Sequence, residues 1–213
     1  MSNRLKQLTW DHHQSAERRA FARKLLRGEL SPYEYYVFLW CQWHNYTPLE
    51  NAVIIPPNLS AIYRTDRIMA DIQELEKEHG FGMPSALPSS VKEYQAHIGS
   101  LAEADDNQGL LAHMYTRHFG ELHGGQIIKR KAPGSGTMYE FEGDTKILIE
   151  EFRKLLNDDM APEAKKCFEF ALDYAAKHPI TDYQFSPINL GDSVNSPAAE
   201  YFPSVTVTDS LLV

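Results

Sequence analysis

Apolar side chains recur at helical spacing along most of the chain, in segments separated by short breaks that contain glycine or proline. In the first segment they fall three or four residues apart from Leu5 to Leu26, and Gly28 follows closely. Such spacing buries one face of a helix, and glycine readily ends one. The pattern predicts a helix over residues 3–27.

Start signals for further helices precede two of the later segments. The sequence SPYE, at Ser31 to Glu34, is a capping box with proline at the first helical position, and it predicts a helix to about residue 51, where IIPPN breaks it. A second capping box, SVKE at Ser90 to Glu93, predicts a helix to about residue 104. Apolar spacing predicts further helices over residues 60–79, 109–129, 144–158 and 162–178.

This succession of helices indicates the fold class. The sequence shows no internal repeat and no alternation of strands with helices, so we expect an all-α, single-domain helical bundle over residues 1–178. Residues 179–213 contain several prolines and lack helical spacing. They are predicted to form an irregular C-terminal tail.

Composition narrows the class of protein. The 213 residues carry a net charge of −8, which disfavours nucleic acid as the main partner. The two cysteines do not form a C-x-x-C pair, which argues against a disulfide scaffold and a cysteine–zinc site. The sequence has no charged-then-apolar leader and no apolar run of membrane length. We therefore expect a cytoplasmic protein with no membrane partner.

Positive charge is concentrated in two places. Residues 1–30 hold seven Lys and Arg against three Asp and Glu, a local charge of +4, and residues 129–131 form a second basic run. A basic segment on an acidic protein is either a solvated face or a local anion site. Charge alone leaves both interpretations open.

The stretch FGELHGGQ, residues 119–126, places three glycines inside a predicted helix. Gly120, Gly124 and Gly125 each cost a helix roughly 1 kcal/mol relative to alanine. A kink or a close helix crossing would explain them, and so would a flat, rigid ligand lying against the backbone. Arg117, Glu121 and Gly125 are spaced by four and project from one side of the helix, beside the column formed by Gly120 and Gly124. This face is a candidate ligand wall with a polar edge.

His13 lies on a helical face of small residues. Thr9, Ala16 and Ala20 stand four residues before it and three and seven residues after it, so the helix surface around this imidazole is nearly flat. Such an imidazole either makes hydrogen bonds between helices or serves as the axial ligand of a planar macrocycle. In the second case, Lys6 could bind the carboxylates of the macrocycle.

A carboxylate-bridged di-metal centre is another kind of site that helical bundles contain. It needs Glu-x-x-His on two helices. The chain offers this pattern once, as EKEH at Glu76 to His79, so the second half of such a centre is missing.

With these residues assembled, the chain resembles a haem oxygenase over about residues 3–175. LTWDHHQSAE is similar to the family's proximal segment, T-x-x-x-H-x-x-A-E, and the match places the axial histidine on His13. LLAHMYTRHFGELHGGQIIKRKA resembles the family's distal-helix signature, ELLVAHxYTRYLGDLSGGQxLKKIA. GTMYEFEGD resembles the segment after that helix, and WHNYTPLE resembles the family's second helix, with Tyr46 and Glu50 at its aromatic and acidic positions.

The resemblance implies an activity and a site. The activity is O₂-dependent cleavage of haem b, which is both cofactor and substrate, to biliverdin, carbon monoxide and ferrous iron, with the IX-alpha isomer as the default. The haem would lie between the first and the distal helix, with His13 as the iron ligand. The implied catalytic residues are Glu121, Arg117 and Tyr46, and the implied haem-binding residues are His13, Lys6, Thr9, Ala16, Glu17, Tyr115, Gly120, Gly124, Gly125 and Arg153.

Two parts of the implied site depart from the family pattern. The distal aspartate is Glu121 here and the nearby serine is His123, so the carboxyl group lies one methylene further out, on the order of 1.5 Å. The longer side chain could fold back toward Arg117, one turn away. Arg153 falls at a propionate-binding arginine, whereas the family lysine one turn earlier is Ile149.

The resemblance also implies partners: haem, O₂ and a soluble electron donor of the ferredoxin type, which the two basic segments would attract. A bilin reductase could act downstream. The alternative function is a haem-binding or haem-sequestering protein of the same fold, whose turnover the change to Glu121 has impaired.

Overall fold

The computed structural model describes residues 3–17, 20–84 and 86–177. Within these ranges the chain folds into helices and contains no β-strand, which confirms the all-α prediction. The predicted tail, residues 179–213, lies outside the described residues, so its irregular form and the domain boundary before it stay predictions. The α-helices are α1 (Asn3–Glu17), α2 (Ala20–Arg27), α3 (Pro32–Ala52), α4 (Thr65–His79), α5 (Ser89–Glu103), α6 (Asn107–Lys129), α7 (Thr145–Arg153) and α8 (Ala161–Lys177), and short 3₁₀ helices are η1 (Pro57–Ile62), η2 (Thr137–Tyr139) and η3 (Asp158–Met160).

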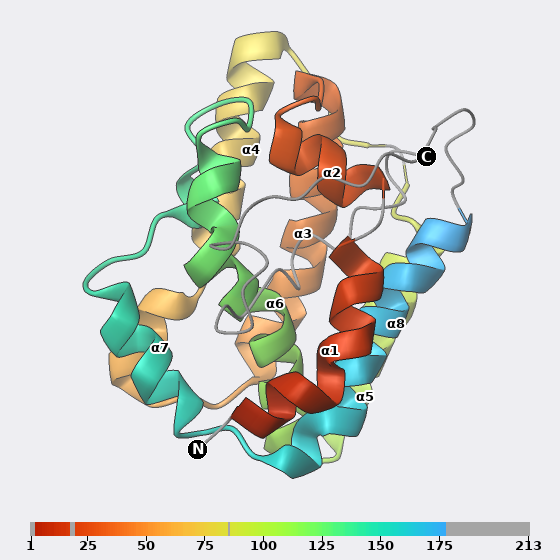
Figure 1. Cartoon of the computed structure of the whole chain (residues 1–213). Helices are drawn as coiled ribbons and strands as arrows, with labels where there is room; N and C mark the ends of the chain where they lie inside the picture. Colours follow the sequence, from red (N-terminus) through yellow and green to blue (C-terminus); the bar gives the residue numbers. More distant parts are fainter. Residues whose placement is uncertain (1–2, 18–19, 85, 178–213) are drawn as a thin grey trace.

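The helices form a bundle in which α3 and α6 pass through the middle (Figure 1). Helix α1 lies alongside α8, and α8 also packs against α5 and α6. Helix α4 packs on α3, and α7 packs against η1 and α6 (Figure 1). The α6 segment that carries the glycines therefore has neighbours on several sides.

The predicted helix over residues 3–27 appears as α1 and α2, which lie on either side of residues 18–19, and those two residues are outside the described ranges, so a single continuous helix stays a prediction. Leu5 of α1 packs in one apolar cluster with residues of α5, α6, α7 and α8. Phe21 and Leu25 of α2 pack in a second cluster with residues of α3 and α4. The apolar residues of α1 and α2 therefore contribute to two different clusters.

Local signals predicted some helix ends correctly. Oγ of Ser31 accepts a hydrogen bond from the Glu34 amide at 3.2 Å, and the Glu34 carboxylate accepts one from the Ser31 amide at 2.7 Å, so the first capping box is confirmed. Helix α4 ends at Gly80, whose φ of 69° lies in the left-handed region that glycine adopts without steric cost. The break at IIPPN is confirmed by the end of α3 at Ala52.

The second capping box is not formed. Helix α5 begins at Ser89, directly after Pro88 in an extended conformation, so Ser90 lies inside the helix and is buried instead of capping it. With Pro88 in the N-cap position, the helix starts two residues earlier than a capping box at Ser90 indicates. The C-terminal elements also differ from their predicted ranges, because α7 ends at Arg153 and η3 separates it from α8.

The start of α4 is held by a residue distant in sequence. A helix was predicted from residue 60, but residues 57–62 form η1, and α4 starts at Thr65. The carboxylate of Glu50, on α3, accepts hydrogen bonds from the backbone amides of Arg64 at 2.6 Å and Thr65 at 3.0 Å. Glu50 thus satisfies amides that an N-cap side chain usually binds.

Candidate functional site

The face of α1 that carries His13 is buried as the spacing predicts. His13, Thr9, Ala16 and Lys6 are all at most 9% exposed, and Oγ1 of Thr9 donates a hydrogen bond to the Leu5 carbonyl at 3.0 Å. Glu17 is the last residue of α1, and its side chain lies outside what the structure describes. Ala20, which was expected on the same face, is the first described residue of α2, and its side chain lies outside what the structure describes, so its placement stays a prediction.

Aromatic rings surround the His13 imidazole. Trp10 stacks on it with ring centroids 5.3 Å apart and an interplanar angle of 6°, and Phe168 of α8 meets it edge-on at 6.2 Å. His12 points elsewhere, since its side chain is 30% exposed and its Nε2 lies 3.7 Å from the Glu169 carboxylate. The structure therefore distinguishes the two adjacent histidines, with His13 inward and His12 outward.

Glu121 of α6 and Tyr46 of α3 form a buried pair. The Tyr46 hydroxyl donates a hydrogen bond to Oε1 of Glu121 at 2.6 Å, and both side chains are fully buried. Burial raises the pKa of Glu121 to about 8, although the hydrogen bond from Tyr46 acts in the opposite direction. The carboxyl group is thus largely protonated at neutral pH, and such a group can hold or donate a proton.

Arg117 lies one turn before Glu121 but turns toward another helix. Its guanidinium carbon stands 4.0 Å from the centroid of the Tyr94 ring on α5, while its main-chain oxygen lies 3.1 Å from the Tyr46 hydroxyl. The carboxyl group of Glu121 has turned to Tyr46, and the arginine side chain packs on Tyr94. The expected fold-back toward Arg117 is replaced by this contact between α6 and α3.

The three signature glycines remain helical in α6. Gly120 is buried. A Cβ atom added to Gly125 would lie 2.7 Å from Cδ1 of Tyr139, which is itself fully buried. Close packing of α6 on η2 therefore explains Gly125 independently of any ligand, and its part in haem binding stays a prediction, as does that of Gly124.

The remaining expected haem contacts lie on three elements. Tyr115 of α6 is 8% exposed and packs on Phe119, with ring centroids 5.5 Å apart.

Lys6 is buried, and its Nζ lies 5.6 Å from the centroid of the Trp10 ring. Arg153 ends α7, and Ile149, which stands where the family has lysine, is part of the apolar core. Leu5 of α1 and Phe152 of α7, the sequence neighbours of Lys6 and Arg153, belong to that same apolar cluster.

Sequence reasoning missed a second buried polar pair beside Tyr46. Nε2 of His118 lies 2.8 Å from Oε1 of Glu50, and the His118 ring packs on the Tyr46 ring with centroids 4.6 Å apart. Burial lowers the pKa of His118, so the neutral imidazole donates to the carboxylate. One signal was available, because the family signature has tyrosine where this chain has His118.

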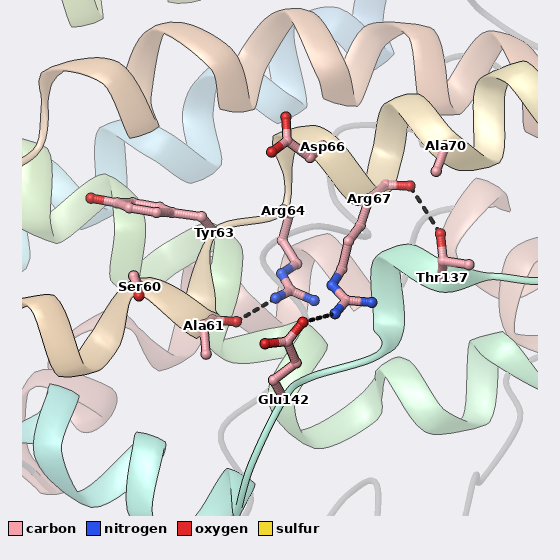
Figure 2. Close-up of a pocket in the computed structure, with 9 residues that line it drawn as sticks. All are labelled: Ser60, Ala61, Tyr63, Arg64, Asp66, Arg67, Ala70, Thr137 and Glu142. Carbon is pink, nitrogen blue, oxygen red and sulfur yellow. Dashed lines mark hydrogen bonds and ion pairs between the residues drawn. The ribbon is translucent and has the colours of Figure 1, made fainter.

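A cavity of about 550 Å³ opens between η1, α4 and the segment after η2, and Figure 2 shows its lining. Arg64 donates hydrogen bonds to the carbonyls of Ile62 at 2.9 Å and Met138 at 3.1 Å, and Arg67 binds the Glu142 carboxylate at 2.8 Å. Both guanidinium groups are thus occupied by protein atoms. None of the predicted site residues lines this cavity.

The di-metal alternative finds no support in the described part of the chain. Glu76 accepts a hydrogen bond from the Tyr36 hydroxyl at 2.8 Å, and His79 stacks on Phe81, so neither joins a cluster of metal-binding groups there. No helix in the described ranges combines the length and the apolar character that crossing a lipid bilayer requires.

Comparison with known proteins agrees with these features. The sequence matches the family model for heme oxygenase over residues 1–170. It is 28% identical over 210 residues to heme oxygenase 2 of Synechocystis, covering 85% of this chain and 83% of that protein. The structure resembles heme oxygenase from Leptospira interrogans, with a TM-score of 0.68, 26% identity and coverage of 80% of this chain and 96% of that one. Synechocystis heme oxygenase 2, solved with heme and NO, gives a TM-score of 0.64 at 25% identity, covering 78% of this chain and 80% of that one.

Proposed function

Because the chain belongs to the haem oxygenase family, we propose that it binds haem b through His13 and cleaves it with O₂ and reducing equivalents. The products are biliverdin, with the IX-alpha isomer as the expected one, carbon monoxide and ferrous iron. The buried pair of Glu121 and Tyr46, inside the helix that carries the family signature, is the observation that carries this proposal.

The residues present fit a bound haem. Oε2 of Glu121 is buried and has no hydrogen-bond partner among the residues that the structure describes. A buried polar atom of this kind needs a partner, and a haem site with its ordered water offers one. His13 supplies a buried imidazole on α1, and histidine is a common axial ligand of haem iron.

Each polar residue has a distinct part in the proposed reaction. Bound haem supplies the iron that binds dioxygen and the ring that is cleaved. Tyr46 donates a hydrogen bond to Oε1 of Glu121, so the carboxylic proton is held on Oε2, which has no hydrogen-bond partner among the described residues. From there Glu121 orients water and supplies protons. Arg117 positions Tyr46 through its main-chain oxygen, and Lys6 and Arg153 bind the propionates.

A haemin titration followed by reduction tests the function. Haemin added to the full chain should give a Soret band, and addition of a reductant system under air should convert it to a biliverdin spectrum with release of carbon monoxide. A Soret band that persists under turnover conditions would instead indicate a haem-sequestering protein. The absence of any Soret change would contradict both functions.

We further propose an acidic ferredoxin as the electron donor, docking where α2 meets the end of α6. Nζ of Lys131 donates to the Leu26 carbonyl at 2.8 Å, so the two basic segments lie side by side. Lys24 and Lys129 are paired with Glu34 and Glu140, whereas Arg130, which follows Lys129, is exposed and offers its charge to a partner.

Kinetics with two electron sources test this docking site. Arg130→Glu should slow ferredoxin-supported turnover at low ionic strength and leave ascorbate-supported turnover unchanged, because only the first needs docking. Equal rates for the parent and the variant with ferredoxin would place the donor elsewhere.

A further inference from the structure

Three side chains from three helices converge away from the residues assigned above. His97 of α5, His113 of α6 and Glu163 of α8 place their ligating atoms within 4.8 Å of one another. Nε2 of His113 lies 3.1 Å from Oε1 of Glu163, and Nε2 of His97 contacts the same oxygen. Among the described residues this is the one group of His, Cys, Asp and Glu that meets in this way.

The arrangement of the rings suits coordination to a single ion. Two imidazoles bound to one tetrahedral Zn²⁺ through nitrogens at ~2.0–2.1 Å have ring centroids about 5 Å apart. The His97 and His113 centroids are 5.4 Å apart, with the ring planes inclined by 54°. Small side-chain movements would therefore admit an ion between the two nitrogens and the carboxylate oxygen.

The protonation states also suit a cation. Hydrogen bonding from His113 lowers the pKa of Glu163 to about 2, and burial lowers the pKa of His113 to about 4. At neutral pH the carboxylate is thus ionised and this imidazole is neutral, which is the state in which both bind metals. The other carboxylate oxygen, Oε2, lies 3.2 Å from Nζ of Lys166, so Oε1 stays directed at the histidines.

The cluster is also accessible from one side. His113 is fully buried, whereas the side chains of His97 and Glu163 are each 18% exposed. Tyr94 and Phe170 pack against the histidine rings and close the apolar side, and the charge of Arg117 acts against protonation of His113. An ion can enter beside His97, and water can complete its coordination.

We propose that His97, His113 and Glu163 form a binding site for a divalent transition-metal cation, with Zn²⁺ as the best match, that joins α5, α6 and α8. Two imidazoles and one carboxylate are a common ligand set for Zn²⁺ and for non-haem Fe²⁺. The bound ion would fix the three helices that carry Tyr94, Arg117 and Phe168. The competing arrangement is a carboxylate that accepts two N–H hydrogen bonds and binds no metal.

Metal binding to the full chain, without haem, tests the proposal directly. After chelator treatment, equilibrium dialysis against Zn²⁺ should load one equivalent on the parent, and Zn²⁺ should raise its thermal midpoint. Glu163→Gln and His97→Ala should each raise the dissociation constant at least 100-fold. His79→Ala, which removes a partly exposed histidine from α4, is the matched control and should bind as the parent does.

Co²⁺ provides a second measurement that needs no variant. Co²⁺ bound by nitrogen and oxygen ligands in a four-coordinate site gives intense visible bands, and Zn²⁺ should displace it. Failure of the parent to load metal, loading that persists in Glu163→Gln, or a Co²⁺ spectrum without these bands would overturn the proposal and leave the hydrogen-bonded cluster. If His97→Ala does not fold, the parent Co²⁺ spectrum and Glu163→Gln decide.

Discussion

The hydroxyl of Tyr46 lies 2.6 Å from Oε1 of Glu121, joining α3 to the helix that carries the glycines. The carboxyl group that stands where the family has aspartate is therefore held by a side chain from another helix. The hydrogen bond from Tyr46 thus fixes the carboxyl group of this longer side chain between the two helices.

Tyr46→Phe should lower turnover more than haem affinity. The change leaves a buried carboxyl oxygen without its donor, a loss of about 1–3 kcal/mol, which corresponds to roughly a tenfold to hundredfold decrease in rate if it falls on the reaction path. Single-turnover rates of biliverdin formation and haemin titrations measure the two effects. Tyr36→Phe, which removes a matched hydrogen bond to Glu76, should turn over as the parent does.

Glu121 should make the fold less stable as pH rises. Its pKa is about 8 when folded, well above that of an exposed glutamate, so the folded protein keeps a proton that the unfolded chain loses. Stability from this group is present at low pH and is lost between about pH 4.5 and 8, at up to roughly 1.4 kcal/mol per pH unit. Urea denaturation across this pH range should show that the difference in free energy of unfolding between the parent and Glu121→Gln changes with pH. Parallel curves would mean that the carboxyl group is already ionised.

His13→Ala should abolish normal haem ligation and turnover, and added imidazole should restore part of both, because it can occupy the space left by the side chain. The measurement is the Soret spectrum with and without imidazole. His12→Ala is the adjacent control and should retain both properties, since His12 is partly exposed and faces Glu169. The reverse result would show that the iron ligand is misassigned by one residue.

The glycines of α6 should separate by their effects. Gly125→Ala should lower the thermal midpoint, because its Cβ would lie 2.7 Å from the buried Tyr139 ring. Gly124→Leu should instead weaken haem binding while the helical circular dichroism is retained. Gly99→Ala on α5 is the control, since no atom lies within 4 Å of its added Cβ, and it should stabilise by up to about 1 kcal/mol. Unchanged haem affinity in Gly124→Leu would leave packing as the only reason for the glycines.

The sequence predicted those features whose causes are local. Ser31 and Glu34 cap α3 with side chains three residues apart, and Gly80 ends α4 through its own backbone conformation. The inward orientation of His13 followed from the small residues at its neighbouring helical positions. Each of these depends on one or two turns of chain, which a sequence pattern can reveal.

Features that depend on distant residues were not predicted. The apolar residues of α1 and α2 enter two different clusters because of where the other helices pack, and the start of α4 depends on a carboxylate from α3. The partner of Glu121 was expected one turn away, yet it is Tyr46, 75 residues earlier in the chain. Pattern and spacing carry no information about such contacts until the helices are packed.

The position of Glu50 has a consequence for how the bundle opens. Its carboxylate binds the amides of Arg64 and Thr65 and also pairs with His118, so one side chain connects α3, α4 and α6. Amides at a helix start usually exchange their hydrogens with solvent quickly, because they lack partners within the helix. Here these two amides become exposed only when α3 separates from α4, so their exchange should be as slow as that of the bundle interior. We therefore expect α3, α4 and α6 to open together, as one cooperative unit, around Glu50.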